Sequence, residues 1–135
     1  PPHTGIGYLK GYGLKSGAVA TSVAHDSHNI ICVGTNDEDM AFAVNRIARN
    51  RGGIVVVENG QVLAELPLEI AGIISGKPLR EVNTLLEDAK KAAHALGVGT
   101  DIDPFMTLSF MSLPVIPTLR LTTRGVVDVN TQQYV

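Results

Sequence analysis

The densest group of polar, ionisable side chains in this 135-residue sequence is a four-residue segment between two apolar runs. It consists of His25, Asp26, Ser27 and His28. Two imidazoles and a carboxylate this close together can position a substrate, transfer protons near neutral pH or bind a metal. The same residue types also form polar bends, in which side chains hydrogen-bond to their own backbone. The residues alone leave both interpretations open.

Neither a catalytic triad nor a metal centre is complete within these four residues. The partners of a Ser-His-Asp triad converge from separate segments, and a metal site needs further ligands. The other histidines are His3 and His94, and His94 falls within a predicted helix. The single cysteine, Cys32, has apolar neighbours, which is typical of an inert buried thiol. We therefore expect no metal site and no cofactor-binding residue in this chain.

Two short strands are predicted to flank the histidine segment. Residues 18–23 are small or β-branched, which favours a buried strand, and residues 30–33 form a second apolar run. Two such runs separated by a few polar residues indicate a hairpin or a bend. The polar segment is then expected at a strand end, where functional groups often lie.

Two amphipathic helices follow in the sequence. The first is predicted to begin after the N-cap Asn36, with acidic residues at 37–39, and to end at residues 52–53. Its predicted apolar stripe is Met40, Val44, Ile47 and Ala48. The second is predicted to begin at Pro78 and to end at Gly97. Its predicted apolar face is Leu79, Val82, Leu85, Leu86, Ala89, Ala93 and Leu96.

The remaining segments complete the predicted order of elements. Strands are expected at 54–57 and 61–66, joined by an Asn-Gly turn, and at 119–121 and 126–129 around a turn. Residues 105–113 fit a short buried helix or a strand, and the prolines at 114 and 117 favour extended backbone. Residues 1–16 are turn-rich, with a short strand expected near 8–12.

This order, roughly ββαββα with an extended C-terminal segment, predicts the α+β class. We expect one domain over residues 1–135, with a mixed or mostly antiparallel sheet covered by helices.

Composition narrows the possible function classes. Hydrophobic residues make up 44% of the chain and charged residues 18%, so a packed core is expected. A net charge of −2, with 4% aromatic residues and no Trp, argues against nucleic-acid binding. No apolar run approaches the ~18 residues of a membrane span, and no basic-then-apolar leader opens the sequence. We expect a soluble, cytoplasmic domain with no nucleic-acid or membrane partner.

Four long runs resemble the C-terminal domain of bacterial adenine deaminases. They are SVAHDSHNI (22–30), GTNDEDM (34–40), LPLEIAGIIS (66–75) and PFMTLSFMSLPVIPTLRLTTRGVVDV (104–129). The run GYLKGYGLKSGAVATSVAHDSHN is also similar to the stretch where that domain begins. Together these runs cover nearly the whole chain in the same order, which makes the resemblance far more specific than a short motif.

The resemblance implies a parent enzyme of the amidohydrolase type, which hydrolyses adenine to hypoxanthine and ammonia in purine salvage. It also implies a divalent-metal centre, with manganese or iron, in a (β/α)₈ barrel. Such a barrel takes roughly 250 residues, and the His-x-His pair of the family's metal ligands is absent from this sequence. We therefore expect the barrel to lie outside this chain as its partner domain, and the isolated chain to be inactive.

The resemblance also suggests what this domain does for its parent. We expect it to pack on the barrel and help to shape or close the active site, with residues 25–28 nearest the substrate adenine. One alternative is a purely structural domain that supports a homo-oligomer through the apolar run Phe105–Val115. Another is a stand-alone purine-binding module.

Overall fold

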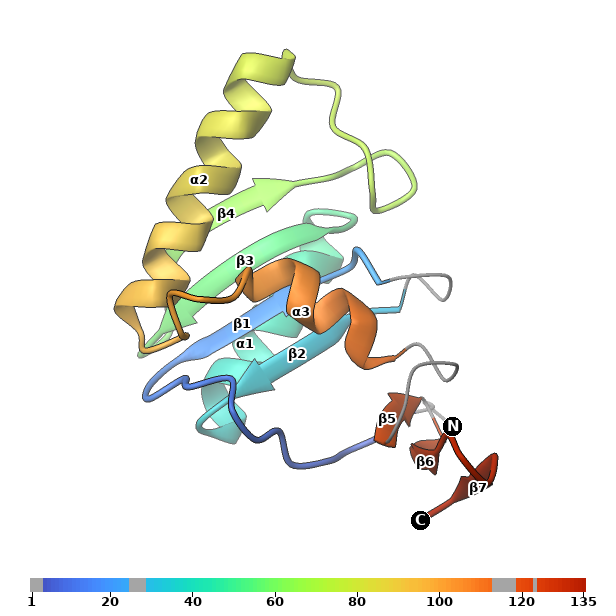
Figure 1. Cartoon of the computed structure of the whole chain (residues 1–135). Helices are drawn as coiled ribbons and strands as arrows, with labels where there is room; N and C mark the ends of the chain where they lie inside the picture. The colour runs from blue at the N-terminus through green and yellow to red at the C-terminus, as the bar shows by residue number, and fades with distance from the viewer. Residues whose placement is uncertain (1–3, 25–28, 113–118, 123) are drawn as a thin grey trace.

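The structure, a computed structural model, describes residues 4–24, 29–112, 119–122 and 124–135. Three helices and seven strands follow one another along these residues (Figure 1). In chain order they are β1 (Ala18–Thr21), β2 (Ile31–Gly34), α1 (Asp37–Arg49), β3 (Gly53–Glu58), β4 (Gln61–Pro67), α2 (Leu79–Ala95), α3 (Pro104–Met111), β5 (Leu119–Thr122), β6 (Gly125–Asp128) and β7 (Gln133–Tyr134). None of the described helices is long and apolar enough to cross a bilayer.

The main layer is a four-stranded antiparallel sheet in the order β2-β1-β3-β4. β3 lies inside the sheet, and its residues Gly53–Val57 are all buried. Alternate residues of the strands face opposite sides, so the sheet carries an apolar cluster on each face. Helix α1 covers one face, and α2 and α3 cover the other (Figure 1). The predicted α+β class and the antiparallel sheet between helices are confirmed.

Helix α1 begins where the sequence predicts, because the side-chain oxygen of Asn36 accepts a hydrogen bond from the Asp39 N–H at 2.8 Å. Its buried stripe differs in part from the prediction. Ala43 and Ile47 are buried, whereas Ala48 is exposed. The spacing of four that relates Ala43 to Ile47 places both on the sheet, and Ala48 falls beyond the edge of this stripe.

Helix α2 has the predicted extent but a shorter apolar face. Ala89 and Ala93 are buried, whereas Leu79 in its first turn is 74% exposed, so the prediction that Leu79 packs on the core is wrong. Of the two alternatives for residues 105–113, the helix is observed over Pro104–Met111. Asp103 caps it by accepting hydrogen bonds from the Phe105 and Met106 N–H groups, both at 3.0 Å. Phe105 and Leu108 then enter the core.

The C-terminal region contains the two predicted strands, observed as β5 and β6, and one strand that was not predicted, β7. β5, β6 and β7 form a separate three-stranded antiparallel sheet, with the predicted turn between β5 and β6. The N-terminal segment has no strand among its described residues, so the strand expected near residues 8–12 is wrong. Gly5 instead lies so close to the Thr122 carbonyl that a side chain there would overlap it. The expected extended backbone at 113–117 falls outside the described residues.

Candidate functional site

The predicted site residues His25, Asp26, Ser27 and His28 lie outside the residues that the structure describes. The strands on either side of them are described. β1 and β2 pair antiparallel, and Thr21, the last residue of β1, pairs with Ile31, the first of β2. The predicted hairpin is therefore confirmed, and the four residues belong to the connection between its strands.

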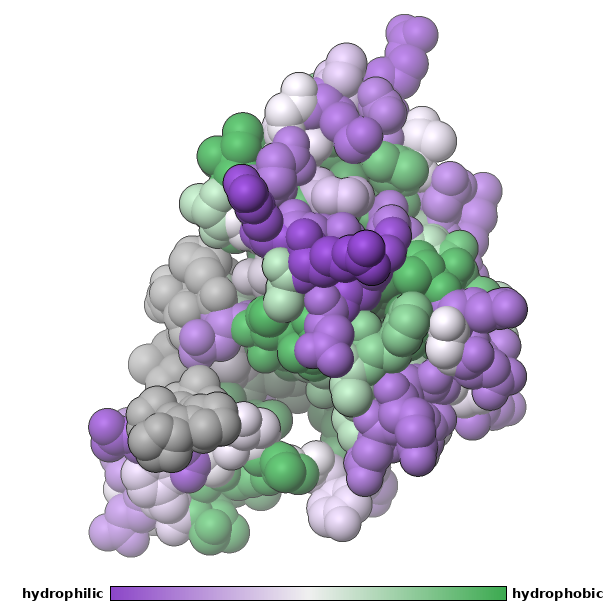
Figure 2. All heavy atoms as spheres, turned by 180° about the vertical axis from the view of Figure 1, so that it is seen from behind, coloured by the Kyte–Doolittle hydropathy of each residue, from purple (hydrophilic) through white to green (hydrophobic). Residues whose placement is uncertain are grey.

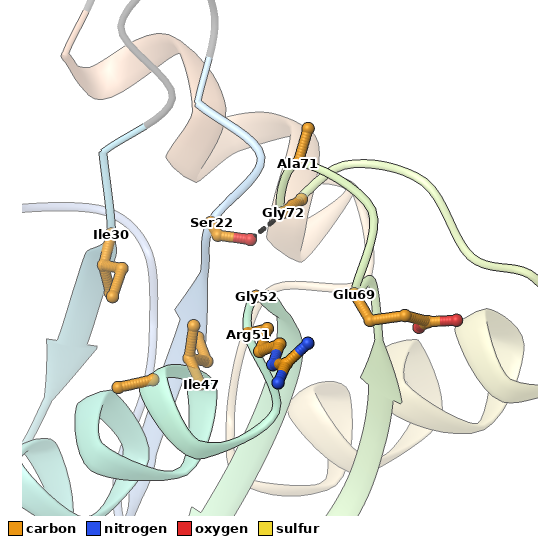
Figure 3. A pocket seen from close by; sticks show the side chains of 9 residues that line it. Ser22, Ile30, Ile47, Arg51, Gly52, Glu69, Ala71 and Gly72 are labelled. Atoms are coloured by element: carbon orange, nitrogen blue, oxygen red, sulfur yellow. Dashed lines mark hydrogen bonds between the residues drawn. The ribbon is translucent and has the colours of Figure 1, made fainter.

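A shallow depression of ≈ 370 Å³ lies beside this connection (Figure 3). It forms where one edge of the main sheet meets the end of α1 and the segment after β4. Its lining includes Ser22 and Ile30, which flank the undescribed residues, and Arg51, Glu69 and Gly72 from the opposite side. Most of this surface is backbone and aliphatic side chain, which favours packing over acid–base chemistry.

The buried hydroxyl of Ser22 is committed to the backbone on two sides. Its oxygen accepts a hydrogen bond from the Gly53 N–H at 2.8 Å, and its O–H donates to the Gly72 carbonyl at 2.5 Å (Figure 3). These bonds join the end of β1 to the start of β3 and to the segment after β4. Ser22 therefore holds the wall of the depression in place and is poorly suited to act as a nucleophile.

Two charged residues lie at the rim of the depression. Glu69 points away from Ser22 (Figure 3), and its Oε1 accepts a hydrogen bond from the Gly76 N–H at 3.0 Å. This bond is the main reason why the pKa of Glu69 lies below its usual value. Glu69 is consequently a carboxylate at neutral pH and is no candidate general acid. Arg51 adds an exposed positive charge.

Cys32 and His94 are the other residues with reactive side chains that the sequence analysis considered, and the contacts of both favour a structural role. Cys32 is half-buried rather than fully buried as expected, and desolvation raises the pKa of its thiol to about 12, which favours the expected lack of reactivity. The Nδ1 atom of His94 lies 3.0 Å from the Val98 carbonyl oxygen, just beyond the end of α2. Within the described ranges, no three His, Cys, Asp or Glu residues gather in an arrangement that could hold a metal ion.

The sequence analysis did not predict that residues 68–76, the segment after β4, would line the depression. The signal of this segment was present, since three isoleucines surround the Ala71-Gly72 pair, but a periodicity search assigns such a short run to no element. It also missed the ion pair of Arg46 with Glu65, in which Arg46 donates two hydrogen bonds at 2.8 and 2.7 Å. That pair links α1 to β4.

The family match and the individual relatives of this chain agree with each other. The family described as the adenine deaminase C-terminal domain matches residues 2–133. The adenine deaminase of Nitratidesulfovibrio vulgaris (strain Hildenborough) is 52% identical over 133 residues, which are 98% of this chain. That of Bacillus subtilis (strain 168) is 47% identical over 132 residues, again 98% of this chain, and that of Dehalococcoides mccartyi is 55% identical over 126 residues, or 93%.

The chain spans only a fraction of these relatives. It covers 23% of the length of the Nitratidesulfovibrio and Bacillus proteins and 22% of the Dehalococcoides protein. The match nevertheless extends over almost every residue of the chain itself, from the segment before β1 to β7. The chain belongs to the adenine deaminase C-terminal domain family.

Proposed function

We propose that this chain serves an enzyme that hydrolyses adenine to hypoxanthine and ammonia, by packing on a separate catalytic barrel and helping to shape its active site. The observation that supports the proposal is the identity of 47 to 55% over nearly the whole chain with proteins named adenine deaminase. The enzyme belongs to the hydrolases, and its barrel is the partner of this domain.

In the proposed enzyme, the barrel supplies the metal centre, and this chain supplies side chains near the substrate. A divalent metal in the barrel, manganese or iron, would activate the water that attacks the purine carbon bearing the amine. This chain would contribute the connection between β1 and β2, with His25 and His28 nearest the substrate. Imidazoles titrate near neutral pH, so they suit the binding of a purine nitrogen or the orientation of the departing ammonia.

Replacing these histidines in the full-length enzyme tests the proposed role. We expect His25→Asn and His28→Asn to lower kcat/KM for adenine by about tenfold or more, as the loss of a positioned imidazole would. The thermal midpoint should stay unchanged. His94→Asn is the matched control, because its ring contacts the Val98 backbone of its own domain. Unchanged kinetics in both variants, or a loss of folded protein, would reject the role near the substrate.

The proposal also predicts that the 135-residue chain alone releases no ammonia from adenine. The measurement is a coupled ammonia assay with added manganese or iron(II), and the full-length enzyme serves as the positive control. Turnover above the rate of the metal alone would contradict the assignment of catalysis to the barrel.

The alternative is a homo-oligomer built through Phe105–Val115. In the described part of that run, Phe105 and Leu108 are covered by the chain's own core, whereas Met106 is 57% exposed and available for a contact. The expected homo-oligomer remains a prediction for analytical ultracentrifugation. The alternative of a stand-alone purine-binding module would require measurable heat when adenine or hypoxanthine is titrated into the chain.

A further inference from the structure

Four exposed isoleucines lie at one edge of the main sheet, and we call them the isoleucine edge. They are Ile30, Ile70, Ile73 and Ile74, with exposed fractions of 40, 50, 37 and 52%. β1 ends and β2 begins at this end of the sheet, where β3 also begins and β4 ends. Ile30 lies across the depression from the segment after β4, since the depression is lined by Ile30 and by Ala71 and Gly72. In Figure 2 hydrophobic side chains project at the upper left, where the segment after β4 lies.

The segment that carries three of these isoleucines has a fixed shape. Ile70 and Ile74 exchange backbone hydrogen bonds of 2.9 and 3.0 Å around a tight turn. Ala71 and Gly72 in this turn have positive φ angles of 56° and 74°. The Ser22 hydroxyl then holds the Gly72 carbonyl against the end of β1. The aliphatic side chains are thus presented to solvent by an internally bonded loop, as at a docking surface.

We propose that the isoleucine edge docks this domain on the remaining part of the same adenine deaminase polypeptide. This inference relies on the proposed function only in placing the chain within a longer adenine deaminase. The relatives have about three quarters of their length outside the matched region, since the chain spans 23% of them. We expect that remaining part of the polypeptide to cover the isoleucine edge. Its contacting surface should be aliphatic, with an acidic group facing Arg51 at the rim.

The size of the patch favours a tethered partner over a second copy of the chain. A stable complex between separate proteins buries ~800 Å² on each partner, from some 20–30 residues. Four isoleucines and their rim are a much smaller surface. A covalent tether raises the effective concentration of the partner to the millimolar range, at which a small apolar contact is sufficient.

Thiol accessibility in the full-length protein tests this docking. Ile74→Cys and, separately, Ile70→Cys are introduced, and labelling with N-ethylmaleimide is followed by mass spectrometry of the peptide that contains each position. Leu63→Cys is the matched control, because Leu63 is 44% exposed but lies near the opposite end of β4. Labelling in urea gives the intrinsic reactivity of each thiol.

We expect the thiols at positions 70 and 74 to react at least about tenfold more slowly than the thiol at position 63 in the native protein, as buried groups that need local opening do. The three rates should converge in urea. Equal native rates would overturn the proposal. So would protection that disappears when the protein is diluted to a monomer, because a second copy would then be the occupant.

The deaminase activity of the same preparations separates this inference from the proposed function. Protected positions 70 and 74 in a protein without deaminase activity would support the docking and reject the function. Freely labelled positions in an active adenine deaminase would reject the docking alone.

Discussion

Asp39 connects three parts of the chain, although its place in the first turn of α1 suggests only a favourable charge at a helix start. Its Oδ2 accepts hydrogen bonds from the Asn36 side-chain amide at 3.1 Å and from the Asn59 N–H at 3.2 Å. Its Oδ1 accepts a bond from the Gly60 N–H at 3.1 Å. One buried carboxylate therefore fixes the β3–β4 turn against the beginning of α1.

These hydrogen bonds predict how Asp39 affects stability with pH. The bond from the Asn36 side chain, followed by that from Gly60, holds the pKa of Asp39 below its usual value. The unfolded chain then binds the proton more tightly, so this stabilisation is complete above the unfolded pKa of about 4 and is lost as pH falls through the folded pKa. We expect Asp39→Asn to lower the urea midpoint at pH 7, and to lower it by less at pH 2.5, which lies below the unfolded pKa.

Asp37→Asn is the matched control, since Asp37 is an exposed acid in the same helical turn. Its urea midpoint should follow that of the unaltered chain at both pH values, apart from a small loss from the helix dipole. Equal effects of the two substitutions at pH 7 would contradict the role given to the hydrogen bonds from Asn59 and Gly60.

The sequence predicts the contacts of Asp39 within the first turn of α1, but it does not predict the hydrogen bonds of Asp39 with the β3–β4 turn. Asn36 as N-cap and the acidic first turn follow from neighbouring residues, because a cap joins groups within one turn of helix. The bonds to Asn59 and Gly60 join residues about twenty positions apart, and only the packed fold brings them together. For the same reason, Ser22 could not be recognised as the group that holds the loop after β4.

At the scale of elements, the junction between α1 and β3 depends on a close approach of two glycines. A Cβ at Gly52 would overlap the Cα of Gly72 and lie 2.9 Å from the Leu68 carbonyl oxygen. Gly52 also has a φ of 121°, which side chains rarely allow. The loop after β4 therefore packs directly on the end of α1, with no room for a side chain.

The close packing of Gly52 on Gly72 predicts that alanine substitutions at Gly52 and at Gly60 have unequal effects on stability. Gly60 also has a positive φ of 71°, but a Cβ there would meet nothing within 4 Å. We expect Gly60→Ala to lower the free energy of unfolding by about 1–2 kcal/mol from backbone strain alone. Gly52→Ala adds overlap to strain, so its loss should exceed about 3 kcal/mol. Urea unfolding of both variants measures the difference, and equal losses would contradict the close packing of Gly52 on Gly72.

Elements with strong local signals were predictable, and those made by tertiary packing were not. The two long helices and the β3–β4 hairpin follow from caps, periodicity and the Asn-Gly turn. The isoleucines of residues 68–76 are visible in the sequence, but the position of this segment, like the pairing of β7 with β6, depends on distant contacts that no sequence pattern indicates. For the candidate site, the connection between β1 and β2 was predicted correctly, whereas the placement of its four central residues remains a prediction.

At the scale of the whole molecule, the described residues form two sheets (Figure 1). The two sheets differ strongly in burial. Helices cover both faces of the main sheet, and all residues of β3 up to Val57 are buried. In β5, β6 and β7 only Val127 is buried. A small sheet with a single buried position gains little from apolar burial, and sheets of this size are only marginally stable without further packing.

Hydrogen exchange should therefore separate two units of the chain. Amides of β1 and β3 are expected to exchange only through global unfolding, whereas amides that pair β5, β6 and β7 should exchange at least about a hundredfold faster through local opening. Because Gly5 and Gly7 lie against β5 and β6, the described residues near the N-terminus should open with this small sheet. Peptide-resolved exchange on the 135-residue chain measures both rates. Equal protection of the two sheets would mean that they unfold as one cooperative unit, and the difference in burial would then be no guide to local stability.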